Sequence, residues 1–168
     1  MSYFNSFNLP IKIIRPFNNF GPRQSARAII PTILSQILNN KSEKLSLGNL
    51  TPTRDFTYVL DTCEAFHQVF LSNKFIGEII NIGSDNEISI KELAFKISKI
   101  MNFNLKVIED TKRVRPKNSE VERLVCSNEK MSKFSNWKPK YNFDDSLELT
   151  IEWFKENSEN LKSNIYNV

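Results

Sequence analysis

The feature that most constrains this chain's fold is an alternation between two kinds of apolar pattern. Short apolar runs typical of strands lie at 11–17, 44–48, 54–59, 77–84 and 105–109. Apolar residues at helical spacing lie at 27–39, 61–70, 89–101, 128–134 and 145–154. Strands that alternate with helices predict an α/β domain.

Three helices are predicted to begin at capping boxes, in which an N-cap side chain is followed three residues later by glutamate. The pairs are Ser89 with Glu92, Asp61 with Glu64, and Asp145 with Glu148. We also expect Trp137 to belong to the core and the single histidine, His67, to be structural.

Polar segments follow the predicted strands at 15–24, 48–54, 83–88 and 110–123. In open α/β sheets, ligands bind beyond the carboxyl ends of the strands, so these segments are predicted to share one cleft. All seven arginines occur at or before Arg123. Arginine presents a planar fork that suits phosphate or carboxylate, which favours an anionic ligand.

Three of these polar segments also have a purely structural interpretation. Asn18 and its neighbour Asn19 could satisfy the backbone of their own loop. Arg54 could form a surface ion pair with the adjacent Asp55, which would contribute little stability. The charged stretch 112–123 could be a solvated loop. The residue patterns alone leave these alternatives open.

Composition argues against several other classes of protein. The net charge of +4 is weak support for nucleic-acid binding, and no recognition-helix pattern accompanies it. No apolar run approaches the length of a membrane-spanning helix, and the N-terminus does not resemble a secretory signal. Cys63 and Cys126 fit neither a disulfide framework nor a metal site. We therefore expect reduced thiols, no bound metal, no membrane partner and a cytoplasmic location.

Two motifs of dinucleotide-dependent dehydrogenases are missing from these 168 residues. The four glycines, Gly21, Gly48, Gly77 and Gly83, leave no G-x-G-x-x-G spacing for a dinucleotide loop. No tyrosine is followed by lysine four positions later, so a Tyr-x-x-x-Lys acid/base pair is absent as well. We therefore predict no catalytic residue in this sequence.

The motifs RPFNNFGPRQ, RDFTYVLD, NIGS, RVRP and NWKP occur in this order along the chain. In order and spacing they resemble the extended short-chain dehydrogenase/reductases that act on nucleotide sugars. The segments GPRQSARAIIPTI, LTPTRDFTYV and SEVERL are most similar to NAD-dependent 4,6-dehydratases of amino-sugar and nonulosonic-acid pathways, such as legionaminic-acid synthesis. The dTDP-glucose 4,6-dehydratases and UDP-sugar 4-epimerases are similar but more distant.

The resemblance implies a role for seven residues. Asn18 would bind the diphosphate or the sugar, Arg54 and Arg115 would hold the diphosphate, and Asn81 would support the site. Arg27 would lie near the nucleotide base. The backbone at Pro16 and Phe17 would lie near the nicotinamide ring of NAD.

The resemblance also implies an α/β fold that is the C-terminal portion of an extended Rossmann-type fold. It would hold the last parallel strands and a small α/β substrate-binding region at 1–157, followed by a polar tail at 158–168. The N-terminal dinucleotide-binding half would be absent, so NAD belongs to the intact family enzyme and this chain alone is expected to bind none. The expected ligand is a nucleotide-diphosphate sugar, and the chain is expected to be inactive alone. The alternative is a non-enzymatic module that complements a separate Rossmann half.

Overall fold

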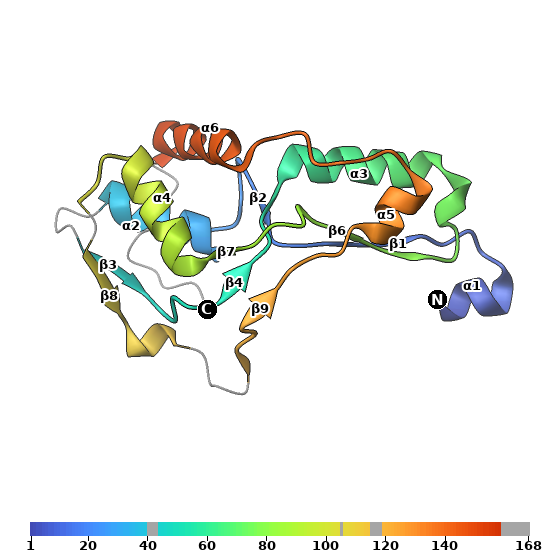
Figure 1. Ribbon diagram of the computed structural model, residues 1–168, viewed down its shortest axis with the longest axis horizontal. Coiled ribbons are helices and arrows are strands. Elements are labelled where there is room, and N and C mark those ends of the chain that lie inside the picture. Colours follow the sequence, from blue (N-terminus) through green and yellow to red (C-terminus); the bar gives the residue numbers. More distant parts are fainter. Residues whose placement is uncertain (40–43, 105, 115–118, 159–168) are drawn as a thin grey trace. The chain divides into compact units, whose positions relative to one another are not determined.

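A computed structural model describes residues 1–39, 44–104, 106–114 and 119–158 (Figure 1). The chain divides into two compact units. Unit 1 comprises Met1–Asn19, Asp55–Glu87 and Val125–Tyr141, and unit 2 comprises Phe20–Arg54, Ile88–Leu124 and Asn142–Val168. The chain therefore passes between the units five times, and each unit is assembled from segments that lie far apart in sequence.

Unit 1 is built on two parallel strands, β1 (Ile13–Pro16) and β6 (Ile79–Ile82). Its helices are α1 (Ser2–Phe7), α3 (Val59–Leu71), α5 (Glu129–Phe134) and the 3-10 turn η1 (Asn73–Phe75), and it includes the short strand β5 (Thr57–Tyr58). The core that joins α3, β6 and α5 consists of Ala65, Val69, Phe75, Ile80, Ile82, Met131 and Trp137. Alternate residues of β6 face this core, as expected for a strand.

Unit 2 contains a parallel pair, β3 (Lys44–Leu47) with β8 (Lys106–Glu109). A second small sheet has the order β7 (Ile88–Ser89), β4 (Thr53–Arg54), β9 (Arg123–Leu124). Three helices pack together, α2 (Ile29–Asn39), α4 (Ile90–Ile100) and α6 (Phe143–Glu156), and the turn η2 (Thr111–Arg113) follows β8. Strand β2 (Asn19–Phe20) lies at the sequence boundary between the units.

Hydrophobic spacing explains how the three helices of unit 2 pack. The residues of α2 that are buried include Ile30, Ile33, Leu34 and Ile37, and those of α6 include Leu147, Ile151 and Phe154. Both sets recur at three- and four-residue intervals, which places them on one helical face. Pro31 lies in the first turn of α2, where a missing backbone N–H costs little.

One predicted capping box is confirmed. The hydroxyl of Ser89 accepts the backbone N–H of Glu92 at 3.1 Å, and the Glu92 carboxylate accepts the backbone N–H of Ser89 at 3.0 Å. The backbone N–H of Ser89, and then its hydroxyl, donate to the Glu92 carboxylate and lower the pKa of Glu92, because they favour the ionised form. The local sequence was sufficient to predict this capping box, because both partners lie within one helical turn.

The other two predicted capping boxes are wrong. Helix α3 begins at Val59, with Tyr58 as its N-cap, so Asp61 lies inside the first turn. Helix α6 begins at Phe143, where the Asn142 side chain accepts the backbone N–H of Asp144, so Asp145 is not the cap. The predicted strand 54–59 is also interrupted, since β4 ends at Arg54 and β5 begins at Thr57.

Asp61 makes long-range contacts instead of a cap. Its carboxylate is buried and accepts the backbone N–H groups of Lys140 at 2.8 Å and Tyr141 at 3.3 Å. Its carbonyl oxygen accepts the indole N–H of Trp137 at 3.1 Å. Asp61 therefore connects α3 to the segment that leaves unit 1 after Tyr141, and Trp137 is buried in the core as predicted.

The α/β fold class is confirmed by parallel strand pairs and the helices that cover them. The described residues contain no helix that is both long and apolar enough to cross a bilayer. The predicted domain limits and the cytoplasmic location stay predictions.

Candidate functional site

In unit 1, some of the predicted site residues lie at the carboxyl ends of β1 and β6. The parallel register places Arg15 opposite Asn81 and Pro16 opposite Ile82. The backbone N–H of Phe17 donates to the carbonyl of Ile82 at 2.8 Å, which extends the pairing by one step. Of the predicted site residues, Pro16, Phe17 and Asn81 therefore lie together, as expected for residues at the ends of neighbouring parallel strands.

Asn18 follows these residues and is held by the segment after β4. Its side-chain amide donates to the carbonyl oxygen of Asp55 at 3.0 Å. Its own carbonyl accepts the backbone N–H of Thr57 at 3.4 Å. The hydrogen bond to Asp55 orients the carboxamide of Asn18 and uses only one of its two N–H hydrogens, so its oxygen and its other N–H are not engaged by Asp55.

The loop after β6 is held by a second set of polar contacts. Asn128 accepts the backbone N–H of Gly83 at 3.0 Å and donates to the carbonyl of Gly83 at 2.8 Å. The thiol of Cys126 is buried and donates to the same side chain at 3.3 Å. Burial, and then the nearby carboxylates of Asp55 and Asp85, raise the pKa of Cys126 to about 12. This thiol stays protonated near neutral pH, which excludes it as a nucleophile.

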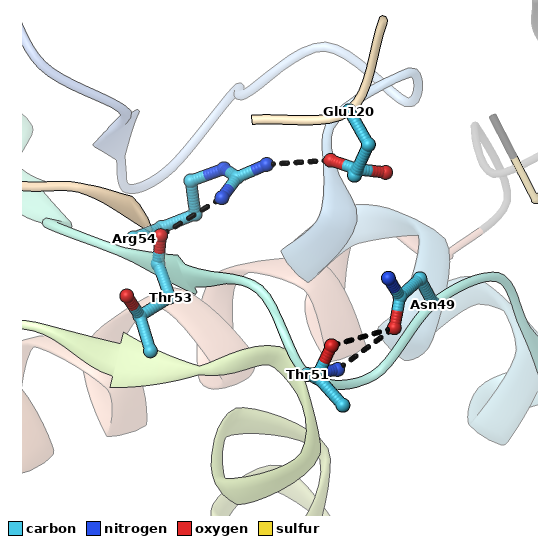
Figure 2. A network of polar contacts seen from close by, with 5 residues as sticks. All are labelled: Asn49, Thr51, Thr53, Arg54 and Glu120. Atoms are coloured by element: carbon cyan, nitrogen blue, oxygen red, sulfur yellow. Dashed lines mark hydrogen bonds and ion pairs between the residues drawn. The ribbon is translucent and has the colours of Figure 1, made fainter. Parts of the chain in front are cut away.

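In unit 2, Arg54 is held on the central strand of the three-stranded sheet. One terminal guanidinium nitrogen donates to the carbonyl of Thr53 at 2.8 Å, and the other donates to the carboxylate of Glu120 at 2.9 Å (Figure 2). Just before β4, the side chain of Asn49 accepts both the N–H and the hydroxyl of Thr51, which fixes the turn that leads into the strand (Figure 2).

The ion pair between Arg54 and Glu120 is well shielded from solvent. The side chains are 14% and 13% exposed. The structural alternative in which Arg54 pairs with Asp55 at the surface is wrong, because Asp55 is fully buried and its carboxylate binds other groups. Neighbouring residues in extended chain point to opposite sides, so adjacency in sequence was a poor guide to their pairing.

Two predicted positions remain, Arg27 and Arg115. Arg27 is exposed, two residues before the start of α2. Arg115 lies outside the described residues. Before it, Arg113 donates to the carboxylate of Asp110 at 3.3 Å, and its carbonyl lies so close to Gly48 that a β-carbon there would be 2.4 Å away. The segment that leads to Arg115 is therefore packed tightly against the end of β3.

Comparison with known proteins places this geometry in a family. The family model described as GDP-mannose 4,6 dehydratase matches residues 1–150. The chain belongs to this dehydratase family. A human dTDP-D-glucose 4,6-dehydratase is 32% identical over 167 residues, which is 96% of this chain and 46% of the relative. A UDP-N-acetyl-alpha-D-glucosaminuronate decarboxylase from Bacillus cytotoxicus is 33% identical, over 88% of this chain and 47% of the relative.

Solved structures agree with the assignment to the dehydratase family. A dTDP-glucose 4,6-dehydratase from Bacillus anthracis, in complex with NAD, has a TM-score of 0.82 at 30% identity and covers 96% of this chain and 50% of that one. A UDP-glucuronic acid 4-epimerase from Bacillus cereus, in complex with UDP-glucuronic acid and NAD, has a TM-score of 0.80 at 28% identity, with coverage of 93% and 48%. The resemblance to extended short-chain dehydrogenase/reductases is thereby confirmed, and the chain spans about half the length of the relatives it matches.

Membership of the dehydratase family implies NAD as a cofactor. The backbone groups at Pro16 and Phe17, the two predicted cofactor positions, show what this chain could offer it. Pro16 has no backbone N–H, and the N–H of Phe17 is already bonded to Ile82. At these two positions the main chain therefore offers a dinucleotide only carbonyl oxygens. The sequence also has no glycine loop for a pyrophosphate. Carbonyl oxygens can accept the carboxamide NH2 of a nicotinamide but cannot bind a pyrophosphate, so no step through the cofactor is derived for this chain.

In the part of the chain that the structure describes, no three His, Cys, Asp or Glu side chains are grouped so that they could hold a metal ion. Sequence reasoning missed three residues that shape the site, namely Asp55, Glu120 and Asn128. Each of them has a hydrogen-bond partner at least 29 positions away, and no local pattern reveals that contact.

Proposed function

We propose that this chain is the substrate-binding part of a nucleotide-sugar 4,6-dehydratase or a related epimerase. The observation that carries the proposal is the shielded guanidinium of Arg54, which Glu120 and the Thr53 carbonyl hold in one orientation. A pre-oriented guanidinium can bind two phosphate oxygens at once with little loss of side-chain entropy. Family membership and the nucleotide-sugar complex of the Bacillus cereus relative support the same ligand class.

In this proposal, Arg54 and Arg115 bind the diphosphate and Asn18 binds the diphosphate or the sugar. Asn81 supports the site beside β1, and Arg27 lies near the nucleotide base. Pro16 and Phe17 line the cofactor side when a dinucleotide-binding half is present. The finer assignment to dehydratases of the legionaminic-acid type stays a prediction from the sequence motifs.

Binding of a nucleotide sugar tests the role of Arg54. Arg54→Ala is expected to raise the Kd for UDP-N-acetylglucosamine about 30-fold, the loss typical of hydrogen bonds to a charged group. The measurement is isothermal titration calorimetry on the 168-residue chain. Lys155→Ala is the matched control, because it removes one positive charge from the exposed last turn of α6. Equal Kd values for the two variants would contradict the proposal.

The chain alone is expected to give no 4-keto product from UDP- or GDP-linked N-acetylglucosamine with added NAD. Hydride and proton transfer each need a positioned partner, and these residues include neither a glycine loop nor a Tyr-x-x-x-Lys pair. Mass spectrometry of the nucleotide sugar detects the loss of water. Turnover by this chain alone would show that other residues can supply the chemistry, whereas turnover only with a separate Rossmann half would favour the complementing module.

A further inference from the structure

Asp55 is the most completely buried acidic residue near the predicted site, and its carboxylate is surrounded by donors. One oxygen accepts the backbone N–H and the hydroxyl of Ser84, at 2.8 and 2.7 Å. The other accepts the backbone N–H groups of Asp85 at 3.0 Å and Cys126 at 3.1 Å. The carboxylate therefore joins the loop after β6 to the segment before α5.

The space around this carboxylate is filled. A β-carbon on Gly83 would lie 2.7 Å from the second Asp55 oxygen. The carboxylate lies too close to Gly83 to shift toward it. If it lost one of its donors, a buried polar group would be left unpaired. The position of Asp55 is therefore determined by contacts that are distant in sequence.

The backbone of the same residue holds Asn18. The carbonyl of Asp55 accepts the Asn18 amide, and the backbone N–H of Thr57, two residues later, donates to the Asn18 carbonyl. Both contacts that orient Asn18 therefore come from the short segment that the Asp55 carboxylate anchors. A change at that carboxylate should reach Asn18 although the Asn18 amide binds the backbone of Asp55 and not its carboxylate.

We propose that Asp55 is a positioning residue for the substrate site and that it acts by orienting the amide of Asn18. The proposal deepens the function proposed above and rests on it for the role of Asn18 in binding. The carboxylate form is required, because each of its two oxygens accepts two donors. In Asp55→Asn, any orientation of the amide directs an NH2 group at two of those donors.

The first test needs no ligand. Side-chain amide hydrogen exchange of Asn18, measured by NMR and assigned by the signal lost in Asn18→Ala, reports its hydrogen bond to Asp55. Exchange is expected to become about 10-fold faster in Asp55→Asn, the factor that corresponds to one hydrogen bond. Asp85→Asn is the matched control, because it removes the same charge from an exposed neighbour whose left-handed backbone asparagine tolerates.

Unchanged Asn18 exchange in Asp55→Asn, or an equal increase in Asp85→Asn, would overturn the proposal. If Asp55→Asn does not fold, Ser84→Ala replaces it, since this change removes only the hydroxyl donor at 2.7 Å. Asn18 exchange should then rise about 3-fold, and no change would equally overturn the proposal.

A double-mutant cycle on binding gives the second test. Asp55→Asn and Asn18→Ala are each expected to raise the Kd for UDP-N-acetylglucosamine about 10-fold, and the double variant no further. A purely structural role for Asp55 would give multiplied effects and would overturn the proposal. If Asn18→Ala leaves the Kd unchanged, the assigned role of Asn18 in binding fails, while the exchange experiment still decides whether Asp55 orients it.

Discussion

Replacing Gly83 with alanine is expected to lower the free energy of unfolding by about 3 kcal/mol, near the upper end for overpacking. The added β-carbon would lie 2.2 Å from the β-carbon of Cys126 and 2.7 Å from a carboxylate oxygen of Asp55. Neither atom is the end of a flexible side chain, because one is attached directly to the backbone and the other accepts two hydrogen bonds. Urea unfolding followed by circular dichroism measures the loss.

A compensating substitution separates this clash from other effects of the added methyl group. Cys126→Gly removes both the β-carbon and the sulfur that Gly83→Ala would meet, while it keeps the backbone N–H that binds Asp55. The double variant is expected to recover about 1 kcal/mol relative to the sum of the single losses, as contacting residues do. Strictly additive losses would mean that the clash with Cys126 is relieved in some other way.

Asp61→Ala is expected to cost about 2 kcal/mol of unfolding free energy, because it removes a buried carboxylate and with it the acceptor of two backbone N–H groups. These groups belong to Lys140 and Tyr141, which lie far from Asp61 in sequence. Thermal or urea unfolding measures the loss, and tryptophan fluorescence follows Trp137, whose indole N–H binds the Asp61 carbonyl.

Asp145→Ala is the matched control for Asp61, since the sequence places both acids in the same kind of capping pattern. Asp145 is exposed in the first turn of α6, so its loss should cost less than about 1 kcal/mol through the helix dipole. Similar losses for the two variants would indicate that Asp61 contributes only as an ordinary residue of the first helical turn.

Some elements were predictable because the interactions that define them are local. The capping box of Ser89 and Glu92 is an example, as is the apolar face of α2. In both, the partners lie within one or two helical turns, so residue type and spacing are sufficient. The starts of α3 and α6 were not predictable, because Asp61 and Asp145 carry the same local pattern and only one of them is buried.

The candidate site likewise has a part that could be predicted from the sequence and a part that could not. The order of strands and polar segments placed Pro16, Phe17 and Asn18 after a strand, whereas only the family resemblance singled out Asn81; the structure has all four near the ends of β1 and β6. The ion-pair partner of Arg54 could not be predicted in this way. Sequence suggested the adjacent Asp55, but the structure pairs Arg54 with Glu120, 66 residues later, and buries Asp55 among backbone donors.

By itself, the sequence determined the α/β class, the helical faces and the family, since these depend on spacing and on motifs in order along the chain. Only the tertiary structure decided how buried charges are satisfied. A carboxylate removed from water needs donors wherever the fold can bring them, and for Asp55 and Asp61 those donors come from segments 29 to 80 residues away. No local sequence pattern identifies hydrogen-bond donors that lie so far along the chain.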